Sequence, residues 1–304
     1  MIAKEWRDAR WKFLIGVVAF LILIPTVSSY EAIKEGVQSQ IDMMQRDLRS
    51  PEKILGPVDE QEQRRFVTSE RNEIRNMQDP AYVEQIARWQ LRDLTHFRNV
   101  AVIVPLAGLF GIGLVAGEVG RGSIFLLLSK PVGRTRMLLT KYAVCATCLF
   151  VIAAIGGGSI ILTAFARGYP PEAVQVSKIL LSTGLTYLGS LFVLGVALIM
   201  SVIFRDILRT LLATVASVFV ILAGPDLLRA LVEWIVWGDR LYTMGPMKFP
   251  PWYRSFDHFR LYDYWIGLQP YSGEMMAARS LVVCVVTATA ALLLALWLFR
   301  RRAY

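Results

Sequence analysis

The sequence predicts an all-α integral membrane protein with six transmembrane helices. It also predicts an N-terminal interfacial helix, an extracytoplasmic helical hairpin between the first two spans, and re-entrant or broken helices before the sixth. The 304 residues are 55% hydrophobic and have a mean hydropathy of +0.47, which is high for a chain with a polar exterior. Several apolar runs approach or reach the ~20 residues that cross a bilayer core as a helix. This composition excludes a soluble enzyme.

The N-terminal region is predicted to form two elements, an interfacial helix over 1–12 and a first span over 13–29. Trp6 and Trp11 alternate with four basic residues, which is typical of an amphipathic helix on a membrane surface. A basic flank before an apolar stretch also fits a cleaved signal peptide. The long flank and its two tryptophans favour a retained segment.

The segment 30–97 is predicted to be a helical projection outside the membrane. It has many Glu, Gln and Arg residues, and Asp79-Pro80 suits an N-cap followed by the first helical residue. We expect one helix from Glu31 to Arg49, a second helix that ends at about Met77, and a third from Pro80 into the second span. A solvated stalk and a docking surface for a partner both fit. The sparse apolar positions predict a narrow seam: Ile41, Met44, Leu48, Phe66, Ile74, Tyr82, Ile86 and Trp89.

The other spans follow from the remaining apolar runs. They are expected at 98–117, 142–166, 179–204, 207–224 and 278–299, with a short tail over 300–304. Cys145 and Cys148 lie inside the third span, where this spacing places two small side chains on one helix face rather than building a redox motif. His96 and His258 belong to no zinc-ligand pattern.

The charge distribution predicts the orientation. Lys and Arg number four in 1–12, five in 118–141, and three at the C-terminus, and Arg205 and Arg209 add two more. The segment 30–97 instead carries ten basic and thirteen acidic residues. Because basic residues mark cytoplasmic loops, both termini are expected in the cytoplasm of a cell membrane protein. The net charge of +9 follows from this pattern, and no soluble basic module supports nucleic-acid binding.

The fifth span is predicted to be interrupted. Residues 207–238 would form a helix of ~48 Å, which is too long for one untilted crossing. We expect a break at Gly224-Pro225 and outer-leaflet re-entrant helices and a loop over 225–277. Asp226, Arg229 and Glu233 would share one helical face, where they either line a pathway or pair with one another at the interface. The aromatic residues of 239–274 suit an interfacial belt.

The segment 118–141 is the most specific part of the sequence. The apolar stretch 124–128 is too short to cross a membrane, and Glu118 and Arg121 precede it while Lys130, Arg134 and Arg136 follow. It is expected to lie along the surface as a short helix that turns at Pro131.

Here the chain resembles the permease subunits of type-2 ABC exporters. In that family the second span ends in a Glu, and a Gly-Thr-like pair, a leucine run and a Ser-x-Pro-Val-x-Arg stretch follow. Ser123 replaces the usual Thr and keeps the hydroxyl. The matching residues are Glu118, Gly122, Ser123, Leu126, Leu127, Leu128, Ser129, Pro131, Val132 and Arg134.

The resemblance implies that 122–136 is a coupling helix that docks on a separate ATPase subunit. An ordinary interfacial helix that touches only lipid is the alternative. Arg205, Asp206 and Arg209 would make a second, weaker cytoplasmic contact. The sequence has no G-x-x-x-x-G-K-[ST] phosphate loop, so no enzyme activity or bound cofactor is expected of this chain, and ATP with Mg²⁺ belongs to the partner.

The hypothesis is therefore an exporter permease that forms a pathway with a second copy or a related chain, and that can also meet an extracytoplasmic protein. An alternative is a membrane anchor or assembly factor that displays 30–97 to a partner protein. An intramembrane enzyme is weakly supported, because the spans contain no H-E-x-x-H motif or other catalytic constellation.

Overall fold

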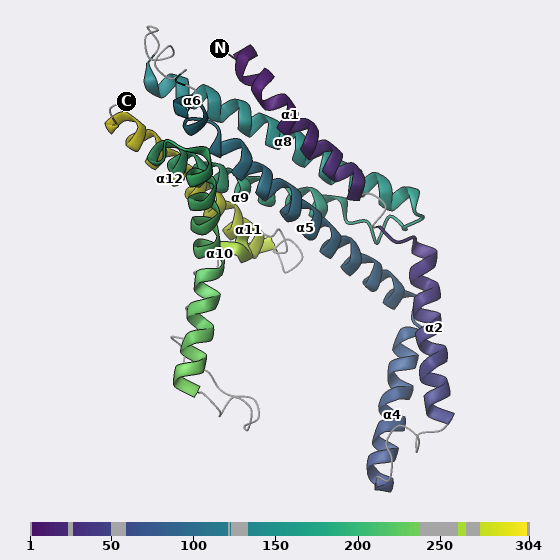
Figure 1. The fold of residues 1–304 in the computed structure, drawn as a ribbon. Coiled ribbons are helices and arrows are strands. Elements are labelled where there is room, and N and C mark those ends of the chain that lie inside the picture. Colours follow the sequence, from purple (N-terminus) through teal and green to yellow (C-terminus); the bar gives the residue numbers. More distant parts are fainter. Residues whose placement is uncertain are drawn as a thin grey trace.

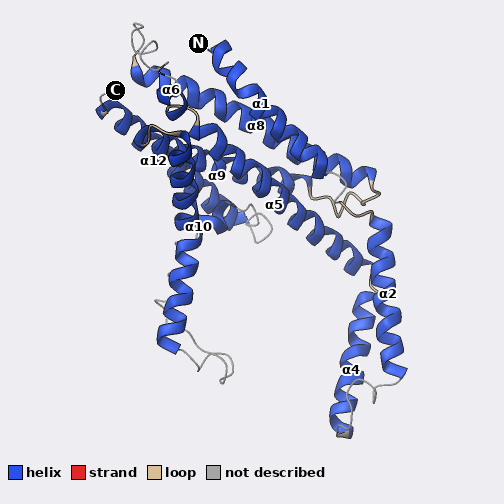
Figure 2. Ribbon diagram, viewed as in Figure 1, coloured by secondary structure: helices blue, strands red, loops and turns tan. Residues whose placement is uncertain are grey.

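The computed structural model consists of helices joined by turns and loops, with no strand among the residues it describes (Figures 1 and 2). It describes residues 2–23, 27–49, 59–120, 122, 133–237, 261–265 and 274–302. The five helices long and apolar enough to cross a membrane, among these residues, are α5 (Pro80–Ile112), α8 (Arg134–Ala166), α9 (Val176–Ile203), most of α10 (Ile207–Trp237) and α12 (Glu274–Arg301). The chain is thus a multi-pass membrane protein.

The N-terminal helix α1 (Ile2–Leu23) is continuous across residue 12, where the sequence was divided into an interfacial segment and a first span. It runs without a break through the expected interfacial segment and into the expected first span. It is not among the five apolar helices, since every long stretch of it includes charged residues from its first half. The helix lies alongside α8 and α5 (Figure 1). Ala9 is buried in the main core, so this half packs on the bundle instead of lying apart on the surface.

Close contacts between small residues hold the bundle together. A side-chain carbon added at Gly111 of α5 would collide with Ala197 of α9, and one at Gly195 would lie 2.7 Å from Ala291 of α12. Small residues let the backbones approach closely, which is how membrane helices gain packing energy without a hydrophobic drive between them. Helix α9 is therefore the centre of the bundle.

A buried cation fixes the far end of α1. The side chain of Arg98 on α5 is fully buried, and its Nη2 donates to the carbonyl of Phe20 and to Ser159 Oγ, each at 3.2 Å. The Phe20 carbonyl belongs to the last turn of α1, where helical carbonyls have no partner within the helix and the dipole is negative. Arg98 thus ties α1, α5 and α8 together.

The predicted projection is a hairpin of α2 (Tyr30–Arg49) and α4 (Glu60–Met77), followed by the first turns of α5 (Figure 1). Asp79 caps α5 as predicted, because its carboxylate accepts from the Ala81 N–H at 2.9 Å. Val37, Ile41, Ile74 and Met77 form the seam. The predicted seam residue Trp89 is instead 51% exposed.

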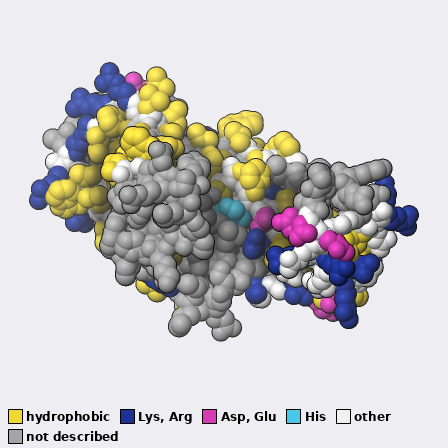
Figure 3. Space-filling view, turned by 90° about the horizontal axis from the view of Figure 1, so that it is seen from below, with side chains coloured by type: hydrophobic (Ala, Val, Ile, Leu, Met, Phe, Trp, Pro, Cys, Tyr) yellow, Lys and Arg dark blue, Asp and Glu magenta, His cyan; other side chains and the backbone are white. Residues whose placement is uncertain are grey.

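The hairpin and the bundle differ in surface chemistry. Seen from the hairpin end, Figure 3 shows acidic and basic side chains mixed over the hairpin and mainly hydrophobic side chains over the described part of the bundle. The hairpin charges form short-range pairs such as Lys34–Glu31 and Arg64–Glu60, both at 2.9 Å. This contrast fits a projection in water attached to a bundle in lipid.

The predicted break in the fifth span is wrong. Helix α10 is continuous from Ile207 to Trp237 with Pro225 inside it. Proline removes one backbone hydrogen bond, and spans tolerate this loss where neighbouring groups re-satisfy the freed carbonyl. Beyond Trp237, the expected re-entrant region lies mostly outside the described residues. Its short helix α11 (Leu261–Trp265) buries Trp265 against Phe192 and Gly189 of α9, so Trp265 is a core residue and not part of an interfacial belt.

Candidate functional site

The candidate site lies at the end of the bundle where α5 finishes and α8 begins, at the same end as the start of α1 and the end of α12 (Figure 1). Helix α5 ends at Ile112, a turn follows, and the short helix α6 spans Ala116–Gly120. Gly122 then has a φ of +69°, a left-handed conformation that glycine adopts without strain. The chain re-enters the described structure at Gly133, directly before α8.

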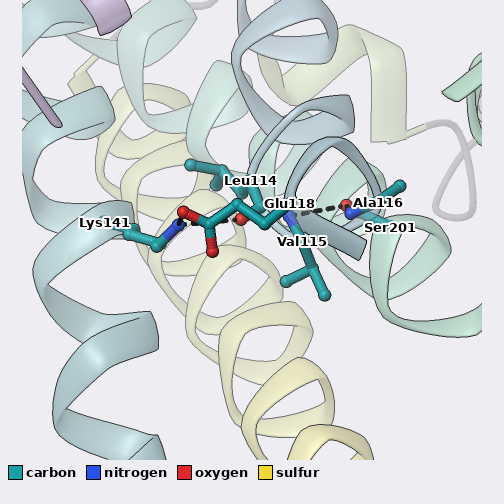
Figure 4. A network of polar contacts seen from close by, with 6 residues as sticks. All are labelled: Leu114, Val115, Ala116, Glu118, Lys141 and Ser201. Atoms are coloured by element: carbon teal, nitrogen blue, oxygen red, sulfur yellow. Dashed lines mark hydrogen bonds and ion pairs between the residues drawn. The ribbon is translucent and has the colours of Figure 1, made fainter. Parts of the chain in front are cut away.

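Ser201 of α9 holds the turn between α5 and α6 (Figure 4). Its hydroxyl accepts from the backbone N–H groups of Val115 and Ala116, at 3.0 and 2.8 Å, and donates to the Ile112 carbonyl at 2.9 Å. These backbone groups have no partner within a helix, because one helix ends and the next begins here. A single fully buried hydroxyl therefore fixes the turn to the centre of the bundle.

Glu118 of α6 and Lys141 of α8 form an ion pair across the two ends of the segment 121–132 (Figure 4). Lys141 Nζ lies 2.6 Å from Glu118 Oε1, and the side chains are 2% and 13% exposed. Lys141 also donates to the Leu114 carbonyl at 3.1 Å. A buried cation is stable only with such partners. We call the set Glu118, Lys141 and Ser201 the clamp, because it joins the chain that leads into segment 121–132 to α8, which follows the segment, and to α9.

A second lysine reaches the same helix end. Lys12 of α1 donates to the Leu109 carbonyl of α5 at 2.6 Å. The carbonyls of the last turn of α5 carry the negative end of its dipole, so cations are stabilised beside them. Lysines from α1 and α8 thus converge on the end of α5.

The loop between α9 and α10 lies beside α6. A side-chain carbon added at Gly120 would be 3.9 Å from the Arg205 carbonyl. Asp206 caps α10, since its carboxylate accepts from the Leu208 N–H at 2.8 Å. The structure thus brings Arg205 and Asp206, two of the three residues of the predicted second contact, next to the clamp. Arg209 follows in the first turn of α10.

The first turn of α8 meets the end of α12. Arg134 Nη1 donates to the Arg302 carbonyl at 3.3 Å, and Arg300 Nε donates to Thr135 Oγ1 at 3.0 Å. Arg134 and Arg136 therefore belong to α8 and not to a separate surface helix. Helix α8 thus begins eight residues before the expected start of the third span at residue 142.

A family model described as ABC-2 family transporter protein matches residues 1–303. The chain belongs to the ABC-2 transporter family. No curated protein matches it. The match covers nearly the whole chain, so it includes the clamp, the hairpin and every span. The chain is accordingly an integral membrane permease of this family.

Much of the predicted coupling segment of this ABC-2 permease lies outside the described residues. Glu118, Gly122, Arg134 and Arg136 are described, and of these Glu118 belongs to the clamp. Sequence reasoning counted Lys141 only as a loop charge and missed Lys12 and Ser201 as site residues. Outside the described structure lie Arg121, Ser123, Leu126, Leu127, Leu128, Ser129, Lys130 and Pro131.

The charged residues predicted after Pro225 lie on α10, the helix that follows the loop 204–206. They are in the part of α10 that is far from the clamp. Asp226 and Arg229 are partly buried on α10, and the Glu233 side chain lies outside the described residues. The lower part of α10 extends away from the other labelled helices (Figure 1), and only 11% of the apolar stretch within Ile207–Val232 of α10 is buried. These residues are separate from the candidate site.

Proposed function

We propose that this chain is the membrane-spanning permease subunit of an ABC exporter, in which the segment 121–132 docks on a separate ATPase subunit. That partner binds ATP and Mg²⁺ and performs the hydrolysis. The permease works with a second copy or a related chain to enclose the pathway. In this proposal the permease has no enzyme activity of its own.

The clamp is the observation that carries this proposal. A docking segment transmits force only if its ends are fixed to the helices that must move. Here Glu118 and Lys141 join α6 to α8, and Ser201 joins the same turn to α9. Motion imposed on 121–132 therefore passes directly into three helices of the bundle.

The charges support a cytoplasmic position for this end. Basic residues lie at the start of α8, around the start of α10 and at the end of α12, which is the same end of the bundle as the clamp: Arg134, Arg136, Arg205, Arg209, Arg300 and Arg301. Basic residues accumulate on the cytoplasmic side of membrane proteins. The start of α1 and the end of α12 also lie at this end (Figure 1), and a cytoplasmic position would expose it to an ATPase and its nucleotide.

The test is a matched pair of aspartate substitutions in the permease co-expressed with its partner ATPase. Leu127→Asp places a charge in the middle of the docking segment, and Met43→Asp places one on the hairpin, where Met43 is 57% exposed. We expect Leu127→Asp to abolish co-purification and permease-dependent ATP hydrolysis, while Met43→Asp leaves both unchanged. Full co-purification and hydrolysis with Leu127→Asp would refute the proposal.

A membrane anchor that displays the hairpin is the second candidate, and the rigid hairpin base favours it. The Tyr30 N–H donates to the Arg167 carbonyl and the Tyr169 hydroxyl to the Ser28 carbonyl, both at 3.1 Å. Replacing residues 42–73 by a short linker separates the two candidates. A permease retains nucleotide-dependent ATPase coupling without the hairpin tip, whereas an anchor loses its whole activity.

A further inference from the structure

A cavity of about 600 Å³ opens beside the clamp, between α1, α5, α8 and α10. Its volume falls in the range of small-molecule binding sites. Four cationic side chains line it, from Arg7, Arg10, Lys12 and Lys141, together with the Glu118 carboxylate. The lining therefore has a net charge of +3, and this excess calls for an anion.

The part of this charge that Arg7 and Arg10 carry is not neutralised by an ion pair within the described part of the chain. Glu118 already pairs with Lys141 in the clamp. Arg7 and Arg10 are exposed and form no ion pair within the described part of the chain, and the Arg10 guanidinium lies 5.7 Å from the centre of the Trp11 ring. Two guanidinium groups on one face of α1 thus remain to receive acceptor oxygens, and guanidinium groups match the geometry of phosphate.

The rest of the lining is apolar. Phe110, Leu114, Ile207 and Leu211 belong to it. On the outer sides of its two walls, Ile15 of α1 and Leu212 of α10 are exposed at 59% and 63%, as lipid-facing residues are. A basic rim over an apolar wall suits a molecule with an anionic head and an apolar tail, and Trp11 is of the type that sits at headgroup level.

We propose that this cavity binds the headgroup of an anionic phospholipid from the leaflet at the loop end of the bundle. Arg7 and Arg10 bind the phosphate, and the acyl chains lie against the walls formed by α1 and α10. Because the clamp supplies one side of the cavity, the bound lipid would contact the clamp residues Glu118 and Lys141. The shared chemistry of this site is a phosphate anion, and the apolar walls assign it to a lipid.

The experiment uses the full-length permease in nanodiscs that contain equal amounts of phosphatidylglycerol and phosphatidylcholine. Native mass spectrometry identifies the lipids that stay bound when the protein is released from the nanodisc. Arg7→Gln with Arg10→Gln removes the basic rim, and Arg300→Gln with Arg301→Gln is its control at the same end of the bundle. Leu211→Trp fills the cavity and leaves every charge in place, so it tests the site without altering the topology signal. Its control is Leu212→Trp, one residue further along α10 and outside the lining.

We expect the wild type and both controls to retain phosphatidylglycerol in preference to phosphatidylcholine. Since each basic residue contributes about 1 kcal/mol to anionic-lipid binding, the Arg7, Arg10 variant should lose that preference roughly tenfold or more. Leu211→Trp should lose it as well. Undiminished preference in both variants would overturn the site. Displacement of all bound phosphatidylglycerol by millimolar inorganic phosphate would overturn the lipid assignment and indicate a free-phosphate site.

Discussion

Lys141 occupies a position where a lysine is stable only with a partner. It lies within α8, its side chain is 2% exposed, and Glu118 is the partner at 2.6 Å. Removing one member of a buried pair leaves an uncompensated charge, which costs more than removing both. The more buried member is Lys141, so loss of Glu118 is the more damaging single change.

Glu118→Gln should therefore lower the free energy of unfolding by roughly 3 kcal/mol. Adding Lys141→Met to it should restore part of that loss, because no buried charge then lacks a counter-ion. The measurement is reversible unfolding in mixed micelles for the wild type, both single variants and the double variant. A double variant that is less stable than Glu118→Gln would argue against the buried pair.

Ser201→Ala should lower the free energy of unfolding by about 1–3 kcal/mol, since it leaves the N–H groups of Val115 and Ala116 and the Ile112 carbonyl without their buried partner. Ser190 is a matched control. It is also fully buried on α9, but its hydroxyl donates to the Tyr187 carbonyl of its own helix at 2.6 Å. Ser190→Ala should cost clearly less in the same unfolding assay. Equal costs for the two serines would contradict the clamp.

These contacts could not be predicted residue by residue from the sequence. Glu118 was expected to be functional, but its partner depends on the turn at 113–115, which starts α6 in a new direction. A serine in an apolar span usually bonds to a carbonyl of its own helix, so Ser201 gave no signal. Lys12 was read as an interfacial charge, because nothing local shows that α5 ends beside it.

At the scale of elements, proline predicted one helix boundary correctly and another wrongly. The Asp79-Pro80 signal correctly predicted where α5 begins, and the run of helix formers predicted α2 and α4. The charges of α1 suggested a separate surface helix, whereas α1 continues past Lys12, which donates to the Leu109 carbonyl. Pro225 suggested a break, yet α10 runs through it.

The base of the hairpin gives a prediction about pH. Burial raises the pKa of Tyr169, and the nearby charge of Arg167 lowers it by a smaller amount. An unfolded tyrosine ionises near pH 10. The pKa of Tyr169 is higher in the folded protein than in the unfolded chain. The contribution of the protonated Tyr169 hydroxyl to the stability of the fold is therefore complete below about pH 10 and is lost as the pH rises from there through the folded pKa.

Wild-type thermal stability should therefore fall faster above about pH 10 than that of Tyr169→Phe, which has no proton to lose. At neutral pH the variant should be slightly less stable, because it lacks the hydrogen bond to the Ser28 carbonyl. Differential scanning fluorimetry across this pH range measures both effects. Parallel curves for the two proteins would show that the hydroxyl is not buried as described.

At the scale of the whole molecule, the composition was sufficient to predict a helical membrane protein but not to establish the number of its spans. Apolar runs correctly predicted an all-helical membrane protein, and the motif around Glu118 predicted the family to which residues 1–303 match. The number of spans was predicted as six, and five described helices meet the length and hydropathy of a span. The sixth predicted span, 13–29, lies partly in α1 and includes residues 24–26, which are outside the described structure.

The central claim is that segment 121–132 contacts a separate ATPase at the clamped end of the bundle. The native cysteines, Cys145, Cys148 and Cys284, are all buried, so an introduced cysteine is the accessible thiol for a bifunctional cross-linker. In membranes containing both subunits, Leu127→Cys should cross-link to the ATPase and Met43→Cys, on the hairpin, should not. Absence of a cross-link from residue 127, or a stronger one from residue 43, would contradict the account.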